Sequence, residues 1–465
     1  MSGPEVHPCE RLSPAPAAAP APSTRSGADQ RSRLLDSIVA VVCSHGYAGA
    51  RIGDIAARAG VSRSTFYELF DDKQACFMAA HRRLAGALLD EFAAAVAAAE
   101  PPDAAHAALA AIARLAERQP RVLAFLTHEA LLAGPEAISG YECMMASLRE
   151  TVEARLARTS AGEAAPAIPV ALLLGGAARL CCLQLRRGGR AGPETLPALL
   201  RWADAYRAVR DRDGWTAAER PLTGAPTPLP ARRCAPRVLP RGRHRLPRDV
   251  VATIQRERIA HAAAEAVMGH GGTGVAVADI VAAAGVSREV FYAHFADKEQ
   301  AFLATQQLIF EQLIAVASSA FFVPDTPWAE RVWNATAASA GLFAANPSFA
   351  HFAFVAAYGI GATGVRRVDE TLLAFGLFLE DGYRALPEPV DCSRITSEAI
   401  VLAVMEAAAH HVRSGRAAEL GALVPSVVYT ALAPFIGPVA ARALVERQLD
   451  APTATAPDRR AAAHR

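Results

Sequence analysis

Polar side chains follow the same Ala-Gly-Val turn at two places in the chain. Residues 62–65 and Tyr67 come after the first turn, and residues 287–289 and Tyr292 come after the second. Serine, threonine, arginine and tyrosine side chains form hydrogen bonds with phosphate oxygens and with base edges. The chemistry that these residues favour is therefore the recognition of double-stranded nucleic acid.

The residues around the first turn predict the three helices that would position this polar segment. Apolar residues recur at helical spacing over 34–42 and predict an amphipathic helix that ends near Gly46. A short second helix ends at Gly60, where glycine tolerates a left-handed backbone. Ser62 is then placed to cap a third helix, and Phe66 and Phe70 lie four apart on its inner face. This pattern predicts a helix-turn-helix with a polar outer face.

The whole unit is duplicated. Residues 51–77 and 276–302 align at an offset of 225, so that Gly60, Ser62 and Phe66 meet Gly285, Ser287 and Phe291. The offset is 227 further on, where Pro347 and Gly361 meet Pro120 and Gly134. A nearly constant offset over about 200 residues indicates a duplicated domain and not a short repeat array.

The shared residues resemble a known family. Gly-Tyr, Asp-Ile-Ala, Ala-Gly-Val-Ser, Phe-Tyr, Phe and Asp-Lys-(Gln/Glu) follow one another as in the N-terminal domain of the TetR/AcrR family, over about 50 residues of each copy. The resemblance implies a three-helix DNA-binding module followed by a helical ligand-binding and dimerisation domain. The segment 417–441 is similar to a C-terminal helix of that family. We therefore expect an all-α chain of two tandem units.

The expected boundaries follow from the duplication and from composition. They are a disordered tail (1–29), a first helix-turn-helix domain (30–78), a first ligand-binding and dimerisation domain (79–210), a Pro/Arg-rich linker (211–249), a second helix-turn-helix domain (250–303), a second ligand-binding domain (304–450) and a disordered tail (451–465).

The expected partner is a double-stranded DNA operator, contacted by both copies. The predicted contact residues are Arg51, Ser62, Arg63, Ser64, Thr65, Tyr67 and Lys73, and in the second copy Ser287, Arg288, Glu289, Tyr292, His294 and Lys298. Lys73 is predicted to bind phosphate, because helix N-termini attract anions. The copies differ where Ser64 is replaced by Glu289, whose carboxylate is repelled by phosphates but can accept from cytosine. We therefore expect the two halves to prefer different base sequences.

Charge is distributed unevenly although the net charge is only +2. Eight basic and five acidic residues lie between Arg31 and Arg83, whereas four basic and six acidic residues lie between Arg256 and Gln300. The linker before the second copy is rich in arginine, at Arg232, Arg233, Arg237, Arg241, Arg243, Arg245 and Arg248. Two interpretations remain open for it: a solvated tether, or an arm that reaches the DNA backbone or minor groove.

The segments after each helix-turn-helix predict a pocket for a small hydrophobic effector. The candidate ligand-binding residues are His128, Tyr141, Met145 and Arg179 in the first unit and Trp333, Phe349, Phe352 and Tyr358 in the second. An apolar, partly aromatic pocket suits a hydrophobic or planar molecule. Ordinary packing between helices is the alternative interpretation for most of these residues.

Catalysis, cofactors and membrane insertion are not expected. The chain carries no Gly-rich phosphate loop, nucleophile elbow or His-Glu zinc motif, and its eight cysteines lack metal-ligand spacing. Asp71-Asp72 is the only pair of aspartates to weigh as a catalytic site, and it lies at a predicted helix start. The longest apolar run, 168–185, contains Arg179 and predicts a buried helix. No secretory signal is recognised, so we expect a cytoplasmic protein. Because the catalytic motifs named above are missing from the sequence, we also expect that it is not an enzyme.

Two units in one chain suggest a fused dimer. Members of the family work as two-fold dimers, and a linker of roughly 40 residues, half extended, spans roughly 65 Å. We expect an intrachain pseudo-dimer on an asymmetric operator, with a four-helix seam formed by 166–187, 195–208, 395–413 and 416–432. Release of repression by the effector is the expected mode of control. The alternatives are a homodimer with a vestigial second DNA-binding module, and a helical scaffold that does not bind DNA.

Overall fold

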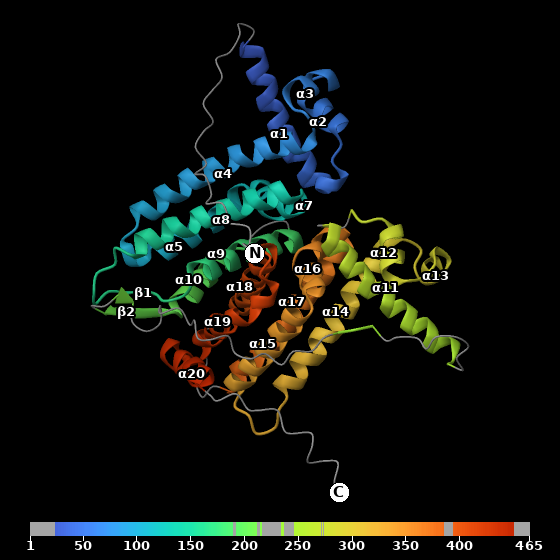
Figure 1. The fold of residues 1–465 in the computed structure, drawn as a ribbon. Helices are drawn as coiled ribbons and strands as arrows, with labels where there is room; N and C mark the ends of the chain where they lie inside the picture. The colour runs from blue at the N-terminus through green and yellow to red at the C-terminus, as the bar shows by residue number, and fades with distance from the viewer. Residues whose placement is uncertain are drawn as a thin grey trace, which may run out of the picture. The chain divides into compact units, whose positions relative to one another are not determined.

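A computed structural model describes residues 24–188, 192–211, 214–215, 234–236, 246–270, 272, 274–385 and 394–450. These residues are almost entirely helical, which confirms the all-α fold (Figure 1). The chain divides into two compact units. Unit 1 comprises Met1–Ala165 and Val170–Ala203, and unit 2 comprises Pro166–Pro169 and Asp204–Arg465.

Unit 1 begins with three helices, of which the second and third are short, and continues with long helices that pack side by side. Its elements are α1 (Thr24–Gly49), α2 (Ile52–Ala59), α3 (Arg63–Leu69), α4 (Lys73–Ala98), η1 (Pro101–Asp103), α5 (Ala104–Arg118), α6 (Pro120–Ala124), η2 (Phe125–Glu129), α7 (Ala130–Leu132), α8 (Pro135–Leu156), β1 (Ala164–Pro166), α9 (Val170–Gly188) and α10 (Thr195–Asp204). The long helix α4 links the first three helices to the later long ones, because it packs on α1 and also runs beside α5 and α8 (Figure 1).

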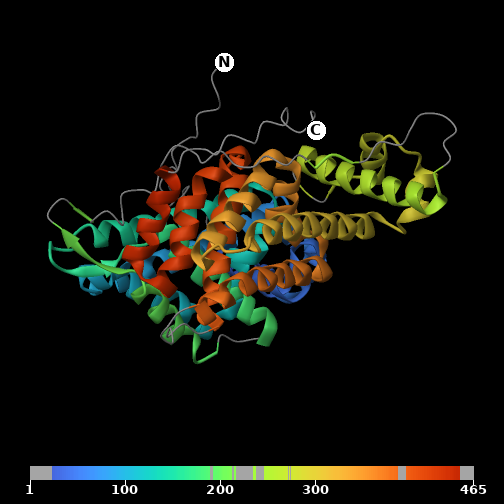
Figure 2. The same cartoon turned by 90° about the horizontal axis from the view of Figure 1, so that it is seen from below.

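Unit 2 repeats this order after a short antiparallel pair of strands, β2 (Arg207–Asp211) and β3 (Gly214–Trp215). Its helices are α11 (Arg248–His270), α12 (Val277–Ala284), α13 (Arg288–His294), α14 (Lys298–Phe321), α15 (Trp328–Ala345), α16 (Pro347–Phe354), η3 (Ala356–Ile360), α17 (Ala362–Ala385), α18 (Arg394–Arg413), η4 (Ala417–Leu423), α19 (Val424–Ile436) and α20 (Pro438–Asp450). Helix α14, amber in Figure 2, packs on α11 and also on the later helices α15, α16 and α17 of the unit.

Several boundaries differ from those expected from the sequence. Helix α1 begins at Thr24, inside the segment expected to be a tail, and its regular part ends at Gly46, where φ is 71°. The segment 417–441 is not one helix, because Gly437 at φ 81° and Pro438 separate α19 from α20. Of the linker arginines, Arg248 begins α11, and the others lie outside the described residues.

The residues directly after α10 pack in unit 2, although the sequence suggested the first ligand-binding domain for them. The Tyr206 hydroxyl donates to the Thr430 carbonyl at 2.6 Å, and the Tyr206 ring lies 6.1 Å from that of Tyr429. Tyr206 is completely buried. A large buried aromatic with its hydroxyl satisfied anchors its segment strongly, so this short segment belongs with α19.

A buried histidine lies at the centre of unit 1. His81 on α4 is 1% exposed, stacks on Phe77, and faces Gly140, where an added Cβ would lie 3.3 Å from the imidazole ring. The pKa of His81 is lowered to about 4, chiefly by burial; a hydrogen bond to the Leu126 backbone opposes this, and the positive charge of Arg82 adds to it. The histidine is therefore neutral in the folded chain near neutral pH.

Replacing His81 by glutamine should flatten the acid limb of the stability curve. The unfolded chain binds a proton at His81 near pH 6.5 and the folded chain only near pH 4, so this stabilisation is complete above pH 6.5 and is lost as the pH falls toward 4. H81Q should remove up to roughly 3 kcal/mol of that pH dependence. Gln306 occupies the matching position of unit 2, so the side chain fits this environment. Urea unfolding between pH 4 and 7 measures it, and an unchanged pH dependence would contradict the assignment.

Candidate nucleic-acid interface and effector cavity

Both recognition helices, α3 and α13, start from the same capped turn. Gly60 (φ 65°, ψ 39°) and Gly285 (φ 61°, ψ 40°) adopt the left-handed backbone that the sequence predicted. The Ser62 hydroxyl accepts a hydrogen bond from the Thr65 N–H at 3.0 Å, and Ser287 accepts from the Val290 N–H at 3.2 Å. The predicted N-caps are confirmed, and they fix where each helix begins.

Each recognition helix has one buried and one exposed face. Phe66 and Phe291 are completely buried, whereas Tyr67 and Tyr292 are each 56% exposed. The exposed face of α3 also carries Arg63 and Ser64, and that of α13 carries Arg288 and Glu289. The structure thus brings Arg63, Ser64 and Tyr67 together on the exposed face of α3. It brings Arg288, Glu289 and Tyr292 together on the exposed face of α13.

The exposed face of α3 also contains a carboxylate that sequence reasoning missed. Glu68 accepts a hydrogen bond from the Ser64 hydroxyl at 3.3 Å, across one helical turn. The matching residue of α13 is Ala293, and the carboxylate of that helix is Glu289. The two surfaces therefore have a negative group at different positions, and the four-residue spacing of Ser64 and Glu68 is the signal that would have shown it.

An arginine clamps the end of each recognition helix. Arg31 on α1 donates to the Leu69 carbonyl at 3.1 Å and lies 4.4 Å above the Phe70 ring. Arg256 on α11 repeats this with the His294 carbonyl at 3.3 Å and the Phe295 ring at 4.6 Å. A cation at a helix C-terminus satisfies free carbonyls and complements the helix dipole. The sequence showed these arginines only as part of the basic charge.

Lys73, predicted to bind phosphate, and Lys298, predicted to contact DNA, are engaged inside their own domains. Lys73 Nζ donates to the carbonyls of Tyr47 and Ala50 at 2.7 and 3.1 Å, and Lys298 Nζ donates to the carbonyl of Val275 at 3.3 Å. Burial lowers the pKa of Lys73. These ammonium groups hold the segment that leads into α2 and α12.

The aspartate before each lysine is a helix cap. Asp72 accepts from the Ala75 N–H at 2.7 Å, and Asp297 accepts from the Gln300 N–H at 2.8 Å. Both are N-caps of long helices, α4 and α14. The Asp71-Asp72 pair thus contains a structural cap, which is its interpretation in this fold.

His294 and Arg51, two other predicted DNA contacts, have different surroundings. His294 is half-buried, and its Nε2 lies 3.1 Å from Gln255 Oε1; burial lowers its pKa, and the Arg256 charge lowers it further. Arg51 is exposed at the N-cap position of α2 and makes no capping hydrogen bond there. Arg51 is therefore placed at a helix N-terminus, where a phosphate would bind favourably.

Comparison with known proteins identifies these domains. The family described as "Bacterial regulatory proteins, tetR family" matches residues 34–80 and 259–305, one match in each unit. The chain is a TetR-family regulator. Its two matched segments contain the capped turns and clamped helices described above, and they confirm tandem DNA-binding domains. Regulators of this family bind DNA and are not enzymes.

Whole-chain comparisons add little beyond this. No curated protein matches the sequence of this TetR-family chain. A solved structure described as a TetR family transcription regulator from Marinobacter aquaeolei VT8 is 20% identical, with a TM-score of 0.33, and the match covers 40% of this chain and 98% of that one.

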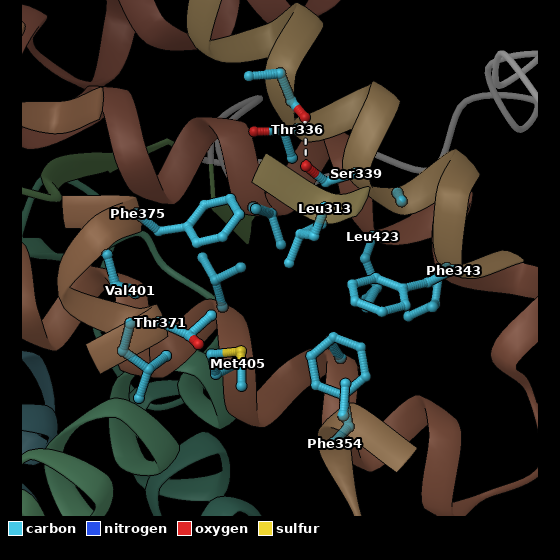
Figure 3. A pocket seen from close by; sticks show the side chains of 18 of the residues that line it. Leu313, Thr336, Ser339, Phe343, Phe354, Thr371, Phe375, Val401, Met405 and Leu423 are labelled. Carbon is cyan, nitrogen blue, oxygen red and sulfur yellow. Dashed lines mark hydrogen bonds between the residues drawn. The ribbon is translucent and has the colours of Figure 1, made fainter. Parts of the chain in front are cut away.

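Unit 2 contains an apolar cavity of about 210 Å³. Figure 3 shows Leu313, Phe343, Phe354, Phe375 and Met405 around it, and these come from five different helices. The lining hydroxyls of Thr336, Ser339 and Thr371 donate to backbone carbonyls of their own helices at 2.7–2.8 Å. The cavity therefore offers mainly hydrocarbon and aromatic surface.

One amide in the lining departs from this apolar pattern. Gln306 is 8% exposed and donates through Nε2 to the Gly364 carbonyl at 3.0 Å. Its Oε1 atom is buried and has no hydrogen-bond partner among the described residues. A buried acceptor without a partner is costly unless something supplies a donor.

The ligand-binding residues predicted from sequence are placed as follows. Phe352 lines the cavity of unit 2, whereas Trp333, Phe349 and Tyr358 are buried in packing outside its lining. In unit 1, Tyr141 and Met145 lie on α8, and Tyr141 is 2% exposed. His128 lies in η2, and Arg179 lies on α9. The aromatic content of the second unit signalled a cavity, but residue types alone could not separate its lining from the core.

Apolar helices in the described part of the chain are explained by packing. The run 168–185 forms most of the buried helix α9, as predicted. Two other segments, Lys298–Phe321 and Ala417–Ile436, are long and apolar enough to cross a membrane by length and composition alone. Both contribute residues to the cavity lining of unit 2.

Salt dependence of DNA binding should separate the two kinds of cation. Arg51→Ala should lower the slope of log affinity against log salt by about 0.9 if this exposed side chain binds one phosphate. Lys73→Met should leave that slope unchanged and instead destabilise the chain by about 1–3 kcal/mol, because two carbonyls lose a charged donor. Fluorescence anisotropy on a duplex and thermal unfolding measure both. A lower slope for K73M would show instead that Lys73 binds a phosphate of the DNA.

Proposed function

We propose that the chain is a transcriptional repressor of the cytoplasm that binds one operator through both recognition helices and is released by a small apolar molecule. The observation that carries this proposal is the repeated surface of α3 and α13, each capped by serine, clamped by arginine and exposed at its tyrosine. A pair of such helices reads two half-sites about 34–36 Å apart. The two units of one chain would then act as a pseudo-dimer.

The two surfaces support an asymmetric operator. Ser64 and Glu68 on α3 correspond to Glu289 and Ala293 on α13, so hydrogen-bond acceptors and negative charge occupy different positions. Symmetric dimers match near-palindromic sites, whereas two different helices favour two different half-sites. Linkage within one chain supplies the second helix at an effective concentration on the order of millimolar.

The lining of the unit 2 cavity supports an apolar effector with one hydrogen-bond donor. Aromatic and aliphatic side chains surround the cavity, and Gln306 Oε1 is the buried acceptor that a ligand hydroxyl or N–H would satisfy. A ligand that binds better to the form with misplaced recognition helices must weaken DNA binding by the same factor. Relief of repression follows from this linkage.

A homodimer with an idle second module is the competing arrangement. It is favoured by the charge of the second copy, where acidic residues outnumber basic ones and Glu289 is exposed on α13. The two arrangements require different residues for DNA binding: the pseudo-dimer needs the exposed residues of both α3 and α13, whereas the homodimer needs only those of α3.

Paired substitutions distinguish the two arrangements. Arg63→Ala with Tyr67→Ala, and separately Arg288→Ala with Tyr292→Ala, should each weaken binding by about 2–5 kcal/mol, because each pair removes two exposed contacts of one helix. The measurement is anisotropy on a duplex that the wild-type chain selects from random-sequence DNA, with light scattering for the mass of the complex. If only the first pair weakens binding and two chains occupy one duplex, the homodimer is correct.

Filling the cavity should abolish uptake of an apolar molecule. Ala408 lines the cavity and Ala407, its neighbour on α18, does not. Ala408→Phe should reduce binding of the neutral dye Nile red at least about tenfold by occupying its space, because the cavity has little room to spare. Ala407→Phe is the control and should retain binding. Equal dye binding by both variants, with both chains folded, would place the apolar site elsewhere.

A further inference from the structure

A buried carboxylate of the ligand-binding part of unit 1 holds the DNA-binding domain. Glu129 is 8% exposed, and its Oε2 accepts a hydrogen bond from the Tyr47 main-chain N–H at 2.8 Å. Tyr47 directly follows Gly46, where the regular part of α1 ends. This hydrogen bond therefore joins the last residue of η2 to the segment that leads into α2. We name it the Glu129–Tyr47 latch.

Tyr47 transmits the position of the latch to α2. Its carbonyl accepts from Lys73 Nζ, which also bonds the Ala50 carbonyl at 3.1 Å, and its ring lies 4.2 Å from that ammonium group. The Tyr47 hydroxyl donates to Gln74 Oε1. Backbone and side chain of Tyr47 are thus fixed together with the start of α2, and α3 follows α2 through the left-handed turn at Gly60.

The element that carries Glu129 is a π-helical turn. Phe125 packs on Phe77 of α4 with ring centres 4.4 Å apart. The Thr127 hydroxyl lies 3.0 Å from the Cys182 sulfur on α9 and donates to the Leu123 carbonyl at 2.7 Å. Isolated π-helical turns are rare and are frequently found at functional sites. This turn touches the core helices on one side and Tyr47 on the other.

Unit 2 keeps the packing but lacks the latch. Phe302 and Phe352 repeat the contact between Phe77 and Phe125, with ring centres 6.1 Å apart. The residue that matches Glu129 is Ala356, and it begins a 3-10 turn instead of ending a π turn. Gly272 matches Tyr47, and its N–H donates to the Val267 carbonyl of the preceding helix, α11, at 3.0 Å. The same backbone donor is therefore satisfied locally in unit 2 and by the ligand-binding part in unit 1.

We propose that Glu129 is the positioning residue through which the helices around η2 set the recognition helix of unit 1, and that α13 has no equivalent control. Repacking at Thr127 that returns the turn to α-helical geometry rotates the carboxylate away from Tyr47 and frees the start of α2. This inference rests on the proposed function, because it concerns DNA binding by α3. Its consequence is that an internal change in unit 1 alters one half of the interface only.

Two substitutions of Glu129 test the latch. Glu129→Ala should weaken binding to a duplex selected by the wild-type chain about tenfold, because a charge-assisted bond is lost and the half-buried Tyr47 N–H loses its acceptor. Glu129→Gln keeps an oxygen acceptor and should lose less affinity. Hydrogen exchange of a peptide covering residues 46–52 should speed up in the same order. Glu153→Ala on α8 is the control, since Glu153 pairs with Arg149 and makes no latch.

A double-mutant cycle separates positioning from mere structural support. Thr127→Val removes the contact with Cys182 and should change DNA affinity in the wild-type chain but not further in the E129A chain, because the signal passes through the latch. Where E129A fails to fold, the same cycle uses E129Q. DNA affinity of E129A within twofold of wild type, or a T127V effect that is equal in both backgrounds, overturns the proposal. If the wild-type chain selects no duplex at all, the proposed function fails and this inference fails with it.

Discussion

The constraint on which both DNA-binding domains depend is the shortness of their recognition helices. Each has only seven residues, and an isolated helix of that length is not stable in water. Serine fixes the first turn, an arginine from the first helix of the domain binds the last carbonyl, and one phenylalanine is buried beneath. Stability therefore comes from groups off the exposed face, which leaves that face free to vary. The two copies use this freedom at Ser64 and Glu289.

Much of this domain could be predicted from the sequence because its determinants are local. A glycine in a left-handed turn, a serine three residues before its hydrogen-bond donor and two phenylalanines one turn apart each act within a few residues. Such short-range patterns survive without knowledge of the tertiary structure. The repetition of the pattern at a constant offset made the assignment of two tandem domains secure.

The parts that sequence reasoning missed depend on contacts far apart in the chain. Arg31 reaches Leu69, and Lys73, expected from its place at a helix start to bind phosphate, reaches Tyr47. Both basic side chains are therefore used within the fold. The cavity lining is drawn from eight elements of unit 2, and a list of aromatic residues cannot show which of them face it. Likewise, nothing local marks Phe125–Glu129 as π-helical.

The presence of two recognition helices in one polypeptide has a consequence for how binding specificity can evolve. In a regulator built from identical chains, a single codon change alters both helices at once, and the energetic effect on a palindrome is doubled. Here Arg63 and Arg288 are encoded separately. If both helices bind one operator, as we propose, a mutation changes the fit to one half-site while the other half-site stays bound. Sequence preference can then drift in small steps without passing through a variant that has lost both contacts.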